Sequence, residues 1–360
     1  ERFSKFFKLK AHLQDWTVRN ARSIRRYIRY LAEIIRNDSL LPFDRGALAA
    51  LVESSSRLIQ DQQKLSLSFP VMREIMIEAN GLANREDAKV VLRSHVEQAE
   101  ENRDFRGNLY QEEFLHEYDR EAIKVPTSGK SVGRAIGLSV SQYGEYVMAL
   151  PHLISCTTGV GHGGVLDLER EAELGGPIHT KGMMILKSYF LDKFARDKPL
   201  TFTGSICLEQ SYAHIDGDSA SGAELASLLS ALSETPISLS LAFTGAVSQS
   251  GTILAVGEVS KKIEGFFQVC KRRGLTGSQG VLIPADNTPH LLLRQEIIDA
   301  VREGAFAVYP VQTIEQAMEI LTGIPSGRQL KGGGFTKGSL YAAVDKRLAR
   351  LAAVAEKYSK

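Results

Sequence analysis

The chain has 360 residues, of which 43% are hydrophobic and 24% are charged, and its formal net charge is +2 at pH 7. This length favours two domains, and the composition is typical of a soluble globular protein. The small net charge predicts no strong attraction to nucleic acid or to acidic membranes.

The cysteines and the apolar runs indicate the cellular compartment in which the protein is expected. The three cysteines, Cys156, Cys207 and Cys270, are far apart and have no metal-ligand spacing, which fits a reducing cytoplasm. No apolar run approaches the roughly 20 residues that are needed to span a bilayer. The sequence begins at Glu1 with neither methionine nor a signal-peptide pattern, so we expect a cytoplasmic protein and a piece of a longer chain.

Residues 1–122 are predicted to form a helical domain. Residues 2–36 are rich in basic side chains, among them Arg22, Arg25, Arg26 and Arg29. We interpret them as a solvated helix face rather than a nucleic-acid patch, because acidic residues elsewhere balance their charge. Asp44 is a good N-cap for a helix. Further helices are predicted over residues 47–60, 70–83 and 86–99, with a turn at 84–87 and a charged connecting helix over 100–123.

A change of pattern near Val125-Pro126 marks the predicted domain boundary. Glycine becomes frequent there, and the apolar period changes from 3.6 to 2. Strands are predicted around residues 136–140, then at 146–150 and 153–157 at hairpin distances, and later at 200–208, 238–243 with a hairpin partner at 252–256, 280–283 and 305–309. Helices are predicted at 179–196, after Ser219, and at 261–273, 290–302 and 313–321. The fold class is therefore α+β, with a helical domain followed by a mixed α/β domain over residues 123–325.

The last segment, residues 326–360, is predicted to be a glycine-rich linker and a helix. Gly332-Gly333-Gly334 interrupts the chain. One apolar helix face follows it, made of Leu340, Val344, Leu348, Leu351, Ala355 and Tyr358. This helix could dock on a partner subunit or fold back on its own chain.

Two glycine-rich motifs resemble nucleotide sites but lack their structural setting. Ser128-Gly129-Lys130-Ser131 resembles the end of a phosphate-binding loop, yet Lys124 stands where that motif needs glycine and a strand-like run follows it. Residues 159–164 match the pattern GxGxxG, but a strand-like run follows them where a dinucleotide site needs a helix. We interpret the second motif as a mobile hairpin tip.

The candidate nucleophile is Ser219, in the polar stretch before a strongly apolar helix. The face of that helix consists of Leu225, Leu228, Leu229 and Leu232. The spacing predicts Ser219 in the first helical turn, where free N–H groups and the helix dipole favour negative charge. A strand, a tight turn and a serine at a helix start could hold a nucleophile beside an oxyanion hole. An ordinary helix cap explains the same residues.

A serine nucleophile needs a base, and two candidates are available. His214 lies five positions before Ser219, although closeness in sequence does not decide its role. Lys262 lies at a predicted strand–turn–helix junction, where a desolvated lysine can lose its proton and accept the serine proton. Taken alone, Lys262 is better explained as a solvated helix lysine, because lysine is almost never fully buried.

The two segments together resemble the Lon-type proteases. Residues 216–221, with the sequence Asp-Gly-Asp-Ser-Ala-Ser, match the catalytic-serine motif of that family, and residues 256–265 match its catalytic-lysine segment. Further matching runs lie at 169–182, 208–212, 243–245 and 280–285, so that the resemblance covers residues 125–325. They look like the Lon-like branch of bacterial proteases in which ATPase and protease share one chain. Residues 1–122 resemble the end of the ATPase module and its helical lid in the same family.

Carried over by position, the resemblance implies Ser219 as nucleophile and Lys262 as general base. Thr244 falls at the family's Thr-Gly position and is expected to orient the lysine. Asp216 and His214 are expected to shape the site, and the N–H groups near Asp218 and Ser219 are expected to form the oxyanion hole.

One departure concerns the lysine segment. It has Glu258 where relatives usually have glycine. Glu258 could raise the pKa of Lys262, whereas Lys261 could lower it, which leaves the resting charge of Lys262 open.

The resemblance implies a serine endopeptidase that cleaves unfolded or damaged proteins, works as a homo-hexameric ring and needs no metal or organic cofactor for its chemistry. ATP and Mg²⁺ are expected only with an ATPase core, because Walker A and Walker B segments do not occur here. The alternative is a catalytically silent, chaperone-like or substrate-binding module of the same fold. A nucleic-acid-binding accessory through the basic N-terminal helices is a third, weaker hypothesis.

Overall fold

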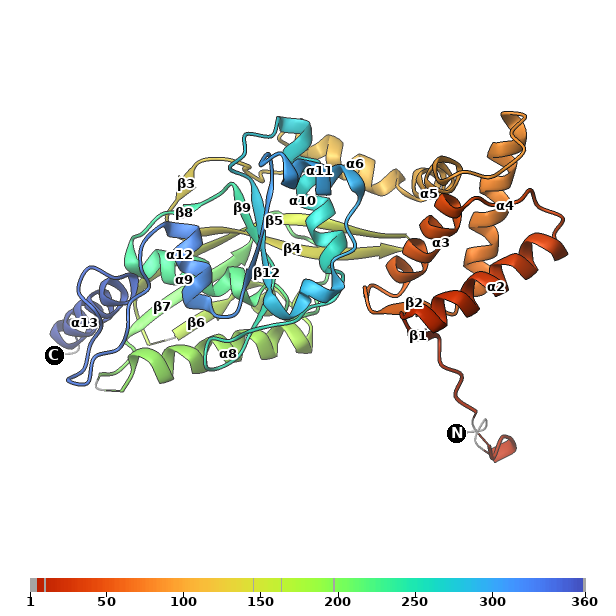
Figure 1. Cartoon of the computed structure of the whole chain (residues 1–360). Coiled ribbons are helices and arrows are strands. Elements are labelled where there is room, and N and C mark those ends of the chain that lie inside the picture. Colours follow the sequence, from red (N-terminus) through yellow and green to blue (C-terminus); the bar gives the residue numbers. More distant parts are fainter. Residues whose placement is uncertain (1–4, 10, 145, 163, 197, 359–360) are drawn as a thin grey trace. The chain divides into compact units, whose positions relative to one another are not determined.

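The computed structural model describes residues 5–9, 11–144, 146–162, 164–196 and 198–358 (Figure 1). The chain forms two compact units, one of residues 1–107 with 289–292 and the other of residues 108–288 with 293–360. The mixture of a helical unit and an α/β unit confirms the predicted fold class.

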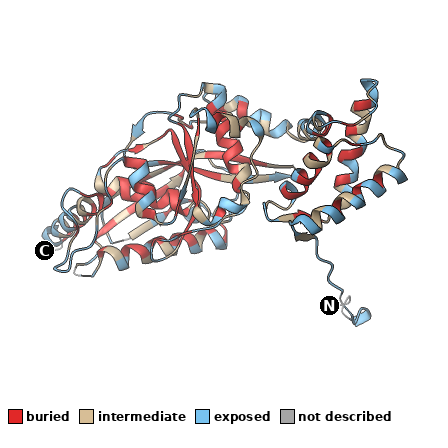
Figure 2. Cartoon of the chain, in the orientation of Figure 1, coloured by how far each residue is buried: buried red, intermediate tan, exposed pale blue. Residues whose placement is uncertain are grey.

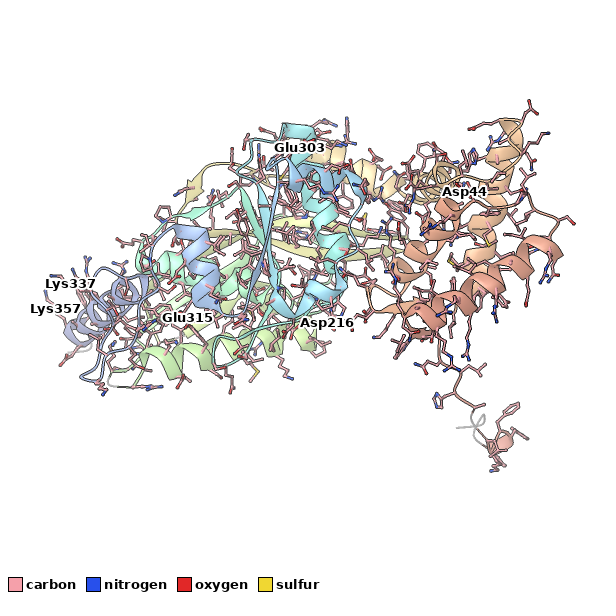
Figure 3. The ribbon with its side chains drawn as sticks, in the orientation of Figure 1. Asp44, Asp216, Glu303, Glu315, Lys337 and Lys357 are labelled. Atoms are coloured by element: carbon pink, nitrogen blue, oxygen red, sulfur yellow. The ribbon has the colours of Figure 1, made fainter. Side chains whose placement is uncertain are left out.

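Within the described residues, the main helices of the first unit are α2 (Ala21–Asn37), α3 (Arg45–Leu58), α4 (Phe69–Arg85) and α5 (Arg93–Gly107). Their inward faces are buried and their outer faces exposed (Figure 2). The four arginines of α2 that were named above are exposed, as a solvated face requires. Asp44, labelled in Figure 3, accepts a hydrogen bond from the Ala47 N–H at 2.6 Å, which confirms it as the N-cap of α3.

Two predictions for this unit are wrong. It is not entirely helical, because β1 (Trp16–Val18) and β2 (Lys64–Ser66) form an antiparallel pair. The helix predicted from residue 86 begins only at Arg93. Val91 exchanges backbone hydrogen bonds with Pro42 and Asp44, so this stretch is extended where the local pattern suggested a helix.

The second unit contains a seven-stranded sheet in the order β13-β12-β9-β4-β5-β7-β6. Its strands are β4 (Arg134–Tyr143), β5 (Tyr146–Val160), β6 (Gly164–Asp167), β7 (Phe202–Leu208), β9 (Leu241–Phe243), β12 (Gly280–Pro284) and β13 (Ala307–Val311). Strand β5 is antiparallel to β4 and β7, and the other neighbours are parallel. The remaining small strands pair outside this sheet as β3 (Lys130–Ser131) with β8 (Ile237–Ser238), and β10 (Ala246–Val247) with β11 (Ile253–Leu254).

Helices cover both faces of this sheet. They are α6 (Leu109–Asp119), α7 (Leu168–Glu171), α8 (Pro177–Phe194), α9 (Ser221–Ser233), α10 (Val259–Arg273), α11 (Gln295–Arg302), α12 (Ile314–Thr322) and α13 (Leu340–Tyr358). Ala223 of α9 packs near Gly137 of β4, whereas Gly265 of α10 lies so close to Ala149 of β5 that a Cβ would come within 2.4 Å of its carbonyl oxygen. Ala149 is paired with Val140, three residues from Gly137. Because neighbouring strand residues point to opposite faces, α9 and α10 lie on opposite sides of the sheet.

Helix α6 lies before the boundary predicted at residue 122, yet it packs with the second unit. The Tyr118 hydroxyl donates a hydrogen bond to the Pro151 carbonyl in β5, and Arg272 of α10 pairs with Asp119 at 2.8 Å. These contacts join α6 to the sheet and to α10.

Several predicted strands and helix starts are corrected by the sheet. Residues 146–150 and 153–157 belong to one long strand, β5, rather than to a hairpin. Residues 252–256 do not pair with 238–243, since β9 lies between β12 and β4 and β11 pairs with β10. The helix predicted from residue 290 begins at Gln295, after a 3₁₀ turn (Ala285–His290).

The two glycine-rich motifs take up structures without a following helix. Lys130 and Ser131 form strand β3 and lead into β4, which is consistent with rejecting a phosphate loop. The second motif ends β5 and begins β6, but these strands flank β7 instead of pairing. The hairpin-tip interpretation is therefore wrong.

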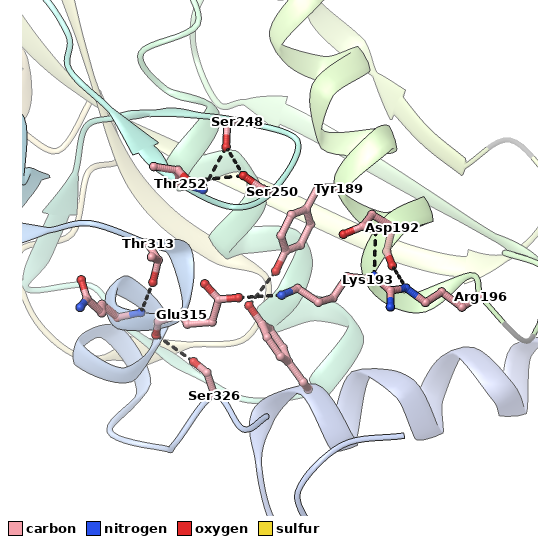
Figure 4. Close-up of polar contacts among 12 residues, drawn as sticks. Tyr189, Asp192, Lys193, Arg196, Ser248, Ser250, Thr252, Thr313, Glu315 and Ser326 are labelled. Atoms are coloured by element: carbon pink, nitrogen blue, oxygen red, sulfur yellow. Dashed lines mark hydrogen bonds and ion pairs between the residues drawn. The ribbon is translucent and has the colours of Figure 1, made fainter. Parts of the chain in front are cut away.

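Helix α13 folds back on its own chain. Leu340, Val344, Leu348 and Leu351 belong to the same buried core as the apolar face of α9, whereas Tyr358 is exposed. Polar contacts link α8 to α13 and to α12 (Figure 4). The hydroxyls of Tyr189 in α8 and Tyr341 in α13 are 2.6 Å apart, and Lys193 Nζ in α8 lies 2.9 Å from Glu315 Oε1 in α12. This answers the question that the sequence left open for the last helix.

Replacing Leu348 by alanine should destabilise the second unit by about 2–5 kcal/mol, because the change leaves a cavity in this core. Chemical denaturation followed by circular dichroism measures the loss. The control is Arg350→Ala on the exposed side of the same helix, which should change stability by less than about 0.5 kcal/mol. Equal losses for the two variants would show that α13 is not packed as described.

Candidate active site

Ser219 lies in the loop between β7 and α9, two residues before the first residue of the helix. The prediction that it occupies the first helical turn is therefore wrong. The Ser219 carbonyl accepts a hydrogen bond from the Gly245 N–H at 2.8 Å and one from Thr244 Oγ1 at 3.3 Å. These bonds attach the serine to the segment that follows β9, and the helix begins only after it. The predicted leucine face of α9 is confirmed, since all four leucines are fully buried.

Lys262 contacts Ser219 directly through its side chain. The lysine lies in the first turn of α10, and its Nζ donates a hydrogen bond to Ser219 Oγ at 2.8 Å. Only 2% of Lys262 is exposed. Two side chains 43 positions apart are thus brought within hydrogen-bond distance in a site with little access to water.

Burial decides the charge balance at Lys262. Desolvation lowers the pKa of Lys262 to about 8, although the charges of Glu258 and Asp218 act to raise it. Lys261 points to a different partner, with its Nζ 3.6 Å from Glu264 Oε2. A substantial fraction of Lys262 is therefore uncharged at mildly alkaline pH, and a neutral amine can accept the serine proton.

Thr244 and Asp216 hold the serine loop from two sides. Thr244 is fully buried, and its hydroxyl bonds to the Ser219 carbonyl; within the described part of the chain no hydrogen bond joins it to Lys262. Asp216, labelled in Figure 3, accepts hydrogen bonds at Oδ1 from the N–H groups of Ile178 (2.9 Å) and His179 (3.3 Å). Its carboxylate thereby caps the N-terminus of α8, where the helix dipole favours negative charge.

The structure does not bring His214 to the serine. His214 is exposed in the loop, and among the described residues it makes no hydrogen bond with Ser219.

The backbone N–H groups of Asp218 and Ser219 have no acceptor among the residues that the structure describes. They are free to bind a ligand oxygen, as the oxyanion hole requires.

Three residues near the site had no role predicted from the sequence: Gly245, His179 and Glu224. Glu224 offered a usable signal, because it lies four positions before Leu228 on the apolar side of α9. A charged residue on such a face is buried only with compensating partners. Gly245 and His179 had no comparable local signal.

The described residues contain neither a candidate metal cluster nor a helix that could span a membrane. In the described ranges, no group of three or more His, Cys, Asp or Glu side chains is placed to hold a metal ion. None of the helices in the described residues is long and apolar enough to cross a bilayer.

Comparison with known proteins gives two family matches. Residues 42–106 match the AAA+ ATPase LID domain of archaeal LonB, and residues 205–323 match the C-terminal proteolytic domain of Lon protease (S16). Both matches lie within the segments where the sequence predicted a lid and a protease domain.

Individual relatives agree with these matches. The chain is 35% identical to a putative Lon protease homolog of Escherichia coli over 304 residues, which cover 84% of this chain and 51% of the relative. It is 34% identical to a putative Lon protease homolog of Haemophilus influenzae over 328 residues (89% and 53%) and 29% identical to an archaeal Lon protease of Archaeoglobus fulgidus over 300 residues (81% and 44%). The chain thus spans about half the length of the curated relatives it matches.

Replacing Glu258 by glutamine should move the rising limb of a pH–rate profile for peptide cleavage to lower pH. The Glu258 charge raises the pKa of Lys262, so its removal lets the lysine lose its proton at lower pH. The midpoint is measured from kcat/KM between pH 6 and 10. The matched control is Glu234→Gln, another glutamate with left-handed backbone, at the far end of α9. An unchanged or raised midpoint for the Glu258 variant would contradict the interpretation that Lys262 is the group whose pKa sets the rising limb.

Proposed function

The chain belongs to the Lon protease family, and on this premise we propose that it is a serine endopeptidase with Ser219 as nucleophile and Lys262 as general base. The observation that carries the proposal is the 2.8 Å separation of Lys262 Nζ and Ser219 Oγ in a buried site. The lowered pKa of Lys262 supports it further, because a base has to be uncharged to accept a proton.

The proposed reaction has two halves. Neutral Lys262 accepts the proton of Ser219 Oγ as that oxygen attacks the peptide carbonyl carbon, and the N–H groups of Asp218 and Ser219 stabilise the negative oxygen of the tetrahedral intermediate. The lysine ammonium then gives its proton to the departing amine, leaving an ester on Ser219. In the second half Lys262 takes a proton from water, the water oxygen attacks the ester, and the proton returns to Ser219.

Thr244 and Asp216 act in this proposal as supports rather than as reactants. Thr244 and Gly245 fix the Ser219 carbonyl through two hydrogen bonds, and Asp216 fixes the loop to the N-terminus of α8. Neighbouring Asp218 contributes charge, since it acts to raise the pKa of Lys262. No metal ion or organic cofactor takes part in the proposed steps.

We further propose that a longer protein containing this chain uses ATP and Mg²⁺ to unfold protein substrates and feed them to Ser219. The match of residues 42–106 to an ATPase lid supports this. The proposal includes a cytoplasmic homo-hexamer acting on unfolded or damaged proteins. The 360-residue chain alone should cleave peptides and unfolded polypeptides but should not hydrolyse ATP. The silent, chaperone-like alternative is supported only by Glu258. Its charge acts to raise the pKa of Lys262, but burial lowers that pKa by more.

Changing either member of the dyad should abolish cleavage of a fluorogenic peptide and of casein. Ser219→Ala removes the attacking oxygen and Lys262→Ala removes the base, so each should lower kcat by on the order of 10⁴-fold or more, as for serine proteases that lose a catalytic side chain. The matched control is Lys261→Ala, which removes the neighbouring lysine and should keep most of the activity. Activity retained by Ser219→Ala would refute the proposed nucleophile. A wild-type chain that cleaves nothing between pH 6 and 10 would favour the silent module.

A further inference from the structure

A buried cluster of charged residues lies directly behind the serine loop. His179, in the first turn of α8, is only 2% exposed. Its Nε2 lies 3.3 Å from Asp167 Oδ1 at the end of β6, and its Nδ1 lies 3.8 Å from Glu224 Oε1 in the first turn of α9. The imidazole therefore lies between two carboxylates that belong to different elements.

The same turn of α8 also carries the serine loop. The backbone N–H groups of Ile178 and His179 donate to Asp216, and the Gly176 N–H donates to the Ile215 carbonyl at 2.8 Å. One turn further on, a methyl group at Gly182 would lie 3.4 Å from Asp218 Cβ. The first six residues of α8 thus form the surface on which residues 215–218 rest.

We propose that His179 is a positioning residue for peptide cleavage: clamped between Asp167 and Glu224, it fixes the first turn of α8 to that of α9 and so holds Ser219 within reach of Lys262. The inference rests on the proposed function for its effect on rate. None of the ring contacts of His179 in the described chain is with Ser219 or Lys262, so it takes no part in the proton transfer itself.

Electrostatics indicates why a histidine occupies this place. Asp167 Oδ2 and Glu224 Oε1 are buried and have no hydrogen-bond partner among the described residues. Buried carboxylates without such partners are costly unless a positive charge compensates them. Asp167 Oδ2 lies 3.3 Å from His179 Nε2, so the histidine is placed to supply that charge.

The charges around His179 keep it protonated below about pH 9. Burial alone would lower the pKa of His179, but the hydrogen bond to Asp167 and the charges of Glu224 and Glu169 outweigh it and raise the pKa to about 9. Burial raises the pKa of Glu224 to about 7. The titratable groups that face the cluster from the surrounding elements are Asp167 on β6, Glu169 on α7, Cys207 on β7, Glu224 on α9, and Asp216 and Asp218 in the serine loop.

The pH dependence follows with a definite sign. Cleavage should rise with pH as Lys262 loses its proton near pH 8 and fall again above about pH 9 as His179 loses its own. A packing role that did not depend on the positive charge of His179 would produce no such alkaline decline.

The test compares His179→Gln with His95→Gln in the 360-residue chain. His95 is a matched control, because it is also buried (4% exposed) and lies 3.0 Å from a carboxylate, Glu86, but belongs to the other compact unit. The His179 variant should lower kcat by about 10–100-fold with little change in KM, since small displacements of a reacting group have effects of this size. It should also lack the alkaline decline, whereas the His95 variant should retain wild-type kcat and profile.

Hydrogen–deuterium exchange provides a readout that needs no activity. Exchange of residues 214–220 should be faster in the His179 variant than in wild type and unchanged in the His95 variant. If wild type cleaves no peptide, the proposed function fails while this measurement still tests the clamp. Unchanged exchange and kcat in the His179 variant would overturn the inference.

A second variant covers failure of His179→Gln to fold. Glu224→Gln keeps the shape of the side chain but removes one of the charges that raise the pKa of His179. The alkaline decline should therefore move to lower pH. A decline that stays in place would overturn the role of the clamp.

Discussion

The hydrogen bond between Lys262 and Ser219 is the contact on which the rest of the site depends. Ser219 comes from the loop before α9 and Lys262 from the first turn of α10, and these two helices cover opposite faces of one sheet. The two side chains can meet only because the loop before α9 is tied to the segment after β9, where Gly245 and Thr244 hold the serine carbonyl. These two hydrogen bonds therefore help to fix the distance between the proposed nucleophile and the proposed base.

Burial lowers the pKa of Lys262, which is one of the two partners in this contact. The same loss of water that lowers the pKa of Lys262 raises the pKa of Glu224, a few residues beyond Ser219. The protein compensates the two effects differently. At Lys262 the opposing charges of Glu258 and Asp218 do not outweigh burial, which suits the proposed role as a base, whereas His179 lies between the two buried carboxylates behind the loop. One physical cause, burial, thus lowers the pKa of the proposed base beside Ser219 and raises the pKa of a carboxyl group behind the serine loop.

The accuracy of the sequence predictions followed the range of the interactions involved. The Asp44 cap and the leucine face of α9 depend on neighbours within a turn or two, and both are confirmed. Strand pairing depends on distant partners, and there the predictions failed: β5 was divided in two, and β11 was assigned the wrong partner. Pro151 explains the first error, because proline lacks the N–H that a central strand donates, whereas β7 pairs with β5 only from Ile154 onward and leaves one side of Pro151 outside the ladder.

By itself, the sequence determined the two chemistry-bearing segments, the family they resemble and the order of a helical unit before an α/β unit, because these are carried by local residue patterns. Only the tertiary structure decided that Lys262, not His214, lies against Ser219, that the lysine is desolvated, and that α13 folds back on α9. The reason is physical. A pKa and a hydrogen-bond partner depend on which groups surround a side chain, and in this protein those groups come from segments far apart along the chain.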